Sequence, residues 1–175
     1  MPEPLPYLVE LVRRMDEPPW QGFLVAQSSE LIVLHRISDR YDLDGYCAFR
    51  AEDVVSVDAE FQRRELIEHA LRIKREEARL PTGTDASSMK ELMESAQRTF
   101  GVLLIEREFV QPGEVEVGTI RMTSPDTFVL RWLDPDAKWE NDSRPFRYRD
   151  VTRLEFASEY EQTLLAVARA RESNG

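Results

Sequence analysis

The chain has 175 residues, of which 42% are hydrophobic and 32% are charged, a balance typical of folded globular proteins and unlike that of disordered chains. Its 33 acidic and 23 basic residues give a formal net charge of −10, which opposes non-specific attraction to nucleic acid or to anionic membranes. A local basic patch remains compatible with this net charge.

The N-terminal residues and the cysteine content indicate a cytoplasmic protein. Residues 1–19 (MPEPLPYLVELVRRMDEPP) carry acids and prolines where a secretory signal has a basic segment followed by a continuous apolar one. No apolar stretch approaches the roughly 20 residues of a membrane-spanning helix. Cys47 is the only cysteine, so an internal disulfide is excluded, in keeping with a reducing compartment.

The first part of the chain is predicted to form five short strands and then a helix. The strands are rich in branched and aromatic residues and are separated by turn-forming residues. They are the segments 8–14 (LVELVRR), 22–27 (GFLVAQ), 31–37 (LIVLHRI), 46–50 (YCAFR) and 54–57 (VVSV). The apolar period then changes from two to about 3.6, which predicts a helix over residues 61–78.

The second part of the chain shows the same sequence of patterns behind an additional helix. Within residues 87–100 the apolar side chains recur at helical spacing, after Ser87 or Ser88 as the N-cap and with Glu91 placed for a capping box. This pattern predicts a helix. Five further strands are predicted at 103–110 (LLIEREFV), 117–122 (VGTIRM), 127–133 (TFVLRWL), 144–149 (RPFRYR) and 151–154 (VTRL). Residues 160–170 are expected to form the last helix.

The two parts align with each other without a gap over residues 8–34 and 104–130, and with small offsets beyond them. The tripeptides that begin at Leu8 (LVE) and Leu104 (LIE) are 96 positions apart, and Gly22 and Gly118 have the same spacing. Identity is low, so the alignment depends mainly on the shared pattern. It predicts an internal repeat, with one unit over residues 1–80, a linker over 81–87 and a second unit over 88–175.

We therefore expect an α+β fold with two tandem five-stranded, strongly bent antiparallel sheets, each followed by an α-helix, and with a further helix before the second sheet. Each unit resembles the Sm-like or SH3-like barrel, and Gly22 and Gly118 near the start of the second strand support the likeness. The Sm-like family implies RNA binding and ring formation. The stretch 43–46 (LDGY) is also similar to one in bacterial proteins of unknown function, which implies no activity.

The densest polar cluster contains Asp39, Asp42 and Asp44, followed by Gly45. Carboxylates in a tightly turned loop are ligands for hard cations such as Ca²⁺. The flanks of this loop are predicted strands, and an EF-hand would require helices and a terminal glutamate. We therefore favour a solvated hairpin with Asp44-Gly45 as its turn, and we expect no metal. The acidic loop remains a candidate binding edge for a basic partner.

A basic run that contains aromatic residues lies at 144–149. Strand alternation places Arg147 and Arg149 on one face and Phe146 and Tyr148 on the other. This separation argues against a platform on which bases stack between cations. A half-buried strand with a cationic outer face explains the pattern better, but single-stranded nucleic acid is a second candidate ligand for the two arginines.

The sequence lacks specific support for catalysis. His35 is in a predicted strand and His69 in a predicted helix, and neither has a partner that the sequence places beside it. Cys47 is best explained as a small buried thiol. No nucleophile elbow, phosphate loop, dinucleotide fingerprint or zinc motif occurs. We expect a protein that is not an enzyme and needs no cofactor.

The leading functional hypothesis is a non-enzymatic interaction or self-assembly module that binds a protein partner or a second copy of itself through barrel edges and acidic loops. The alternative is binding of RNA or single-stranded nucleic acid through the Sm-like barrel, which the net charge opposes. The candidate binding residues are Asp39, Asp42, Asp44, Arg147 and Arg149.

Overall fold

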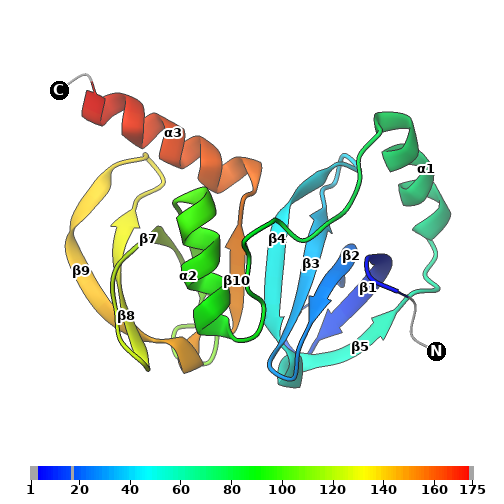
Figure 1. Cartoon of the computed structure of the whole chain (residues 1–175), viewed down its shortest axis with the longest axis horizontal. Coiled ribbons are helices and arrows are strands. Elements are labelled where there is room, and N and C mark those ends of the chain that lie inside the picture. The colour runs from blue at the N-terminus through cyan, green and yellow to red at the C-terminus, as the bar shows by residue number, and fades with distance from the viewer. Residues whose placement is uncertain (1–3, 17, 174–175) are drawn as a thin grey trace.

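All the strands of the structure belong to one antiparallel sheet (Figure 1). The computed structural model describes residues 4–16 and 18–173, and within them ten strands have the order β5-β1-β2-β3-β4-β10-β6-β7-β8-β9. In chain order they are β1 (Tyr7–Arg13), β2 (Trp20–Gln27), β3 (Leu31–Ile37), β4 (Leu43–Arg50), β5 (Val54–Asp58), β6 (Leu103–Glu106), β7 (Val115–Thr123), β8 (Thr127–Leu133), β9 (Trp139–Arg147) and β10 (Arg153–Phe156). Each predicted strand overlaps one of these.

The prediction of two separate barrels is wrong. β4 pairs with β10, with Phe49 opposite Arg153 and Tyr46 opposite Phe156, so the two halves continue into one sheet. The sheet does not close, and β5 and β9 are its edges. A strand edge carries unpaired N–H and C=O groups that need partners. The edge strands β4 and β10 pair with each other and so hydrogen-bond these groups. The chain therefore forms one continuous sheet in place of the two separate barrels that the sequence pattern indicated.

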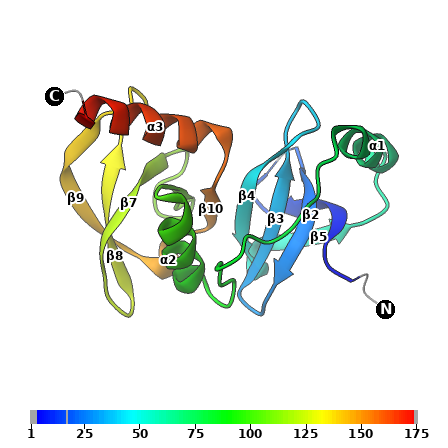
Figure 2. The ribbon, with the colours of Figure 1, turned by 45° about the horizontal axis from the view of Figure 1, so that its top comes forward.

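Three helices accompany the sheet in the described part of the chain: α1 (Arg64–Lys74), α2 (Met89–Phe100) and α3 (Glu159–Ser173). Figure 2 shows α1 beside the N-terminal half and α3 along the C-terminal half. The inner face of α1 buries Ile67 and Leu71 against Leu8, so this helix packs on its own half. None of the helices described is long and apolar enough to cross a membrane.

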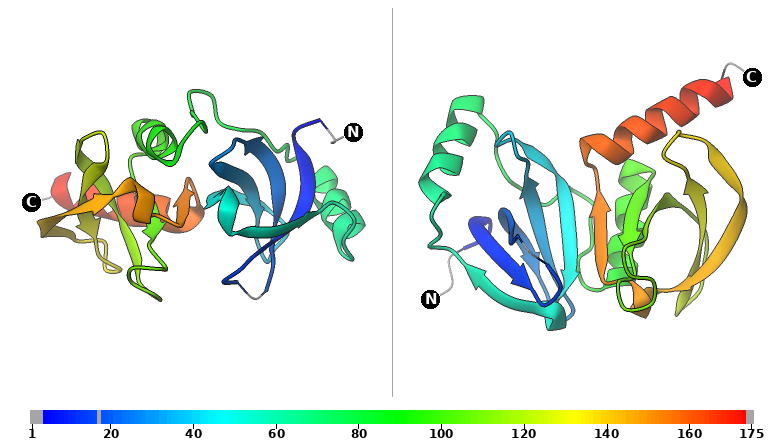
Figure 3. Two further views of the ribbon diagram at one scale, coloured as in Figure 1. Left: turned by 90° about the horizontal axis from the view of Figure 1, so that it is seen from below. Right: turned by 180° about the vertical axis from the view of Figure 1, so that it is seen from behind.

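The main hydrophobic cluster spans the join between the two halves. α2 contributes its apolar stripe, which begins at Met89, and the sheet contributes residues from both halves, such as Val33 and Leu130. Figures 1 and 3 show α2 on one face of the C-terminal half, close to the join. Ser88 caps this helix, because its Oγ accepts the backbone N–H of Glu91 at 3.2 Å, as the sequence predicted.

The two halves have corresponding strand orders and registers. The order β5-β1-β2-β3-β4 in one half corresponds to β10-β6-β7-β8-β9 in the other. Gly22 is opposite Arg36 and Gly118 is opposite Trp132, and a register irregularity follows each glycine along its strand. The internal repeat and the division at residues 81–87 stay predictions.

The predicted turn at Asp44-Gly45 is wrong. The β3–β4 turn lies earlier, where the Tyr41 N–H donates to the Ser38 carbonyl at 2.9 Å, and β4 already includes Gly45. Gly45 has φ +65° and passes so close to Ser158 that a Cβ atom there would lie 2.5 Å from the Ser158 nitrogen. The glycine is needed because the start of α3 packs against β4 at this point.

We expect Gly45→Ala to destabilise the fold far more than Gly83→Ala. Both glycines have positive φ, so both substitutions incur the left-handed backbone cost of about 1–2 kcal/mol. No atom lies within 4 Å of the Cβ position of Gly83, whereas at Gly45 backbone atoms must also move. Urea unfolding should show that Gly45→Ala lowers the free energy of unfolding by about 3 kcal/mol or more. Equal losses in the two variants would contradict the close approach of β4 and α3.

Candidate functional site

The structure gives the three predicted acidic residues different environments. Asp39 is exposed in the β3–β4 turn and forms no ion pair with another described residue. Asp42 pairs with Lys74 of α1. Asp44 accepts hydrogen bonds at 2.8 Å from Arg36 and from the backbone N–H of Glu159. Two of the three carboxylates therefore hold α1 and α3 in place, and only Asp39 is available to a partner.

Arg147 and Arg149 are exposed, as predicted, on the side opposite their aromatic neighbours. Arg147 ends β9, and Arg149 lies in the following 3₁₀ turn (Tyr148–Asp150). Phe146 and Tyr148 are buried, each with an exposed fraction of 6%. The two arginines therefore project from the molecule, while their neighbours anchor the segment in the core.

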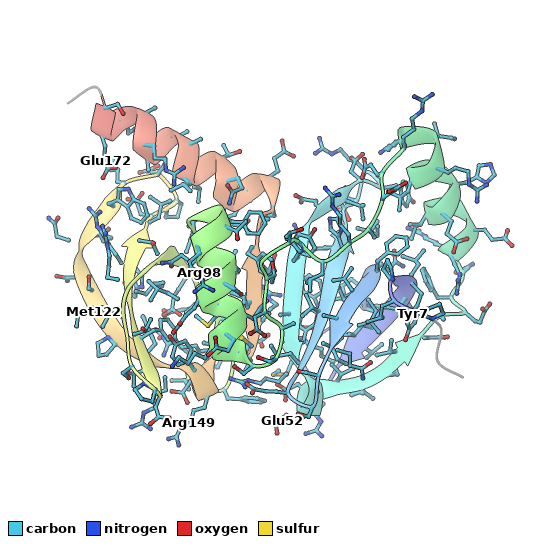
Figure 4. The ribbon with its side chains drawn as sticks, viewed as in Figure 1. Tyr7, Glu52, Arg98, Met122, Arg149 and Glu172 are labelled. Atoms are coloured by element: carbon cyan, nitrogen blue, oxygen red, sulfur yellow. The ribbon has the colours of Figure 1, made fainter. Side chains whose placement is uncertain are left out.

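A cleft of about 780 Å³ brings Arg147 and Arg149 together with residues from both halves of the sheet. We call it the basic cleft. Its lining includes the β2–β3 turn, the end of β4, the first turn of α2, the β7–β8 turn and the segment after β9. Figure 4 shows Arg149 below the N-terminal end of α2. The lining residues are Glu30, Arg50, Ser88, Lys90, Pro125, Asp126, Thr127, Arg147, Tyr148 and Arg149.

The floor of the basic cleft is a fixed ion pair between Arg50 and Glu30. Arg50 also donates hydrogen bonds to the carbonyls of Val151, at 2.9 Å, and Tyr148, at 2.5 Å. Glu30 accepts the backbone N–H of Met89 at 3.1 Å. Together with the Ser88 cap, this carboxylate occupies N–H groups in the first turn of α2. The guanidinium of Arg50 is committed to the fold.

The rim of the basic cleft carries three cations, of which Arg147 and Arg149 are exposed and Lys90 is partly buried. The Lys90 ammonium lies 6.0 Å from the centroid of the Tyr148 ring. Arg147 forms no ion pair with any residue that the structure describes, and Arg149 has a loose one at 3.8 Å with Asp150. Asp126 is the exposed acid on the lining. The rim therefore has a local positive charge in a chain that is acidic overall.

The rim is firmly supported by the core beneath it. The Tyr148 hydroxyl donates a hydrogen bond at 2.9 Å to Glu94 of α2, and burial together with this contact raises the pKa of Tyr148. Its ring also packs against Phe128, with centroids 4.9 Å apart. Tyr148 thereby ties the segment between the two arginines to α2, which fixes the backbone from which they project.

A second cleft, also of about 780 Å³, contains Asp39 and Asp44. Part of its lining is paired within the protein: Arg36 is held by Asp44, and the Trp20 Nε1–H donates to Asp16 at 2.5 Å. Within residues 4–16 and 18–173, no group of three or more His, Cys, Asp or Glu side chains is placed to hold a metal ion.

The histidines and the cysteine lie outside both clefts. His35 is half-buried and stacks on Tyr46 at 4.3 Å, and its Nδ1 atom has no hydrogen-bond partner in the described part of the chain. Burial, aided by Arg79, lowers the pKa of His35 to about 4, so the ring is neutral at pH 7. His69 is exposed on α1. Cys47 is fully buried, and burial raises the pKa of its thiol.

Sequence reasoning named Arg147 and Arg149 as candidates but not Glu30, Arg50 and Lys90, which line the same cleft. One signal was present for Lys90, because it falls in the first turn of a predicted helix, where the helix dipole favours acids over bases. Glu30 and Arg50 carried no such signal, since their role depends on contacts with distant residues. No protein-family model, curated protein or solved structure matches the chain, so its function is inferred from its own residues.

The neutral state of His35 predicts a specific loss of stability in acid. The pKa of His35 is about 4 in the folded protein and about 6.5 when unfolded, so its stabilising contribution is complete above pH 6.5 and declines as pH falls towards 4. His35→Phe keeps a ring against Tyr46 and removes the titration. Between pH 7 and 4.5, the free energy of unfolding measured in urea should fall by about 1–3 kcal/mol less in the variant than in the parent. Parallel pH profiles would contradict this assignment.

Proposed function

We propose that the protein is a non-enzymatic interaction protein that binds an anionic segment of a partner in the basic cleft. The observation that carries this proposal is the convergence of Lys90, Arg147 and Arg149 on one cleft without strong partners among the described residues. The net charge of the chain is −10, so this cluster is a local basic patch on an acidic protein.

The electrostatics of the rim supports a binding role. Like charges that share a small surface repel one another, by about 1 kcal/mol per pair at 4 Å in water. Lys90 also lies at the positive end of the α2 dipole, where a cation is unfavourable. The positive charge of Arg50 is balanced by Glu30, but the rim cations have no comparable partner within the described structure. An anionic ligand would relieve both effects at once.

The acidic loop receives less support as the binding surface. Asp42 and Asp44 are held by Lys74 and Arg36, so a basic partner would have to compete with these internal pairs. Of the three aspartates, only Asp39 is exposed without an ion pair to another described residue. The interaction hypothesis therefore moves from the acidic loop to the basic cleft, and the expected charge of the partner segment changes from positive to negative.

Single-stranded nucleic acid is the alternative ligand for the same arginines. Sequence-tolerant binding of this kind combines cations with exposed aromatic rings on which bases stack. In the basic cleft the aromatic residue is Tyr148, and it is buried. The cleft thus offers charge without a stacking surface, and this favours an acidic protein segment over nucleic acid.

We expect the double variant Arg147→Glu/Arg149→Glu to lose binding of anionic probes. The probes are a fluorescein-labelled glutamate-rich peptide and a labelled oligothymidylate, each followed by fluorescence anisotropy at low and high salt. Reversal of both charges should weaken binding about tenfold or more, since it removes two attractive pairs and adds repulsion. Binding by the parent should also weaken with salt.

The matched control is Arg14→Glu/Arg72→Glu, which makes the same change in net charge at exposed positions away from the basic cleft. It should retain most of the affinity of the parent. Equal losses in the two double variants would show that only net charge matters, and failure of the parent to bind either probe would remove the proposed function. Tighter, cleft-dependent binding of the oligothymidylate would make nucleic acid the ligand.

A further inference from the structure

We infer that Glu30 sets the specificity of the basic cleft, so that the cleft accepts an extended, carboxylate-rich protein segment and excludes a compact phosphate group. This inference rests on the proposed function and names the chemistry of its ligand. It follows from the position of one acidic side chain in an otherwise basic site.

Glu30 blocks the place where a phosphate would bind most favourably. A helix N-terminus attracts phosphate because its free N–H groups point at the anion. Here the Met89 N–H is bound by Glu30 at 3.1 Å, and the Glu91 N–H is bound by Ser88. The Glu30 side chain is 37% exposed, so its charge faces the cleft. A dianion that approached the first turn of α2 would meet a carboxylate already in place.

The cations that remain available are spread around the rim. Lys90 projects from α2, Arg147 from the end of β9, and Arg149 from the 3₁₀ turn beyond it. Arginine pairs well with both carboxylates and phosphates because its planar guanidinium donates two parallel hydrogen bonds, so the preference between them is set by Glu30. Carboxylates distributed along an extended segment can pair with these side chains one by one and stay clear of Glu30.

The size of the cleft also suits an extended ligand. Its volume of about 780 Å³ greatly exceeds the space that a single phosphate group requires, and its lining runs from the β2–β3 turn to the β7–β8 turn. A short peptide segment could fill it, with its acids directed to the rim. Glu30 and Asp126 would then limit where those acids can be placed.

The experiment compares two labelled peptides of equal formal charge, one rich in glutamate and one in which pairs of glutamates are replaced by single phosphoserines. The parent protein should bind the glutamate peptide more tightly, by about threefold or more. Glu30→Gln should raise the affinity for the phosphopeptide more than for the glutamate peptide and so remove or reverse this preference.

Glu91→Gln is the matched control. It removes a carboxylate from the first turn of α2, which Glu30 contacts, but Glu91 does not line the cleft. It should leave the preference unchanged. Circular dichroism and urea unfolding would establish that both variants are folded, since Glu30 also pairs with Arg50.

The outcomes separate this inference from the proposed function. If both peptides bind and both depend on Arg147 and Arg149, but the parent prefers the phosphopeptide, the inference fails and the function stands. An unchanged preference in Glu30→Gln would likewise overturn the role of Glu30. If neither peptide binds the parent, the inference and the proposed function fail together.

Discussion

The pairing of β4 with β10 is the interaction on which the rest of the structure depends. It joins two curved halves into one sheet, and it brings the end of β4 beside the segment that precedes β10. Arg50 can therefore donate to the carbonyls of Val151 and Tyr148 in the other half. α2 then covers a core built from both halves. The basic cleft exists only because of this join, since each half supplies part of its lining.

Ion pairs with at least one buried partner reinforce the same join. Arg13, whose side chain is fully buried, pairs with Glu108 at 2.8 Å, and Arg36 pairs with Glu155 at 2.9 Å. Burial alone would raise the pKa of Glu108, but the hydrogen bonds from Arg13 and Thr152 outweigh it and lower that pKa. Buried pairs of this kind add little net stability, because desolvation offsets attraction. We interpret them as fixing how the halves align, since any other alignment would leave these charges unpaired.

The sequence predicted what depends on neighbouring residues and missed what depends on distant ones. Strand alternation, the helical period and the Ser88 cap are local patterns, and each appears in the structure. The pairing of β4 with β10 and the ion pair of Glu30 with Arg50 join residues far apart in the chain, and no local pattern encodes them. Gly45 was misread for the same reason: it has to be glycine because of distant Ser158, and Asp-Gly also happens to be a common turn.

The open edges of the sheet help to decide where a partner would bind. Pro145 lies in edge strand β9 and has no N–H, so this edge lacks a donor that strand addition would use. The acidic Glu140 and Asp142 on the same strand would repel an acidic partner or the same edge of a second copy. β5, the other edge, is only five residues long. Because both edges are poorly suited to extending the sheet, they favour the proposed recognition by side chains in the basic cleft over strand addition, and the joined sheet is the scaffold that holds those side chains in place.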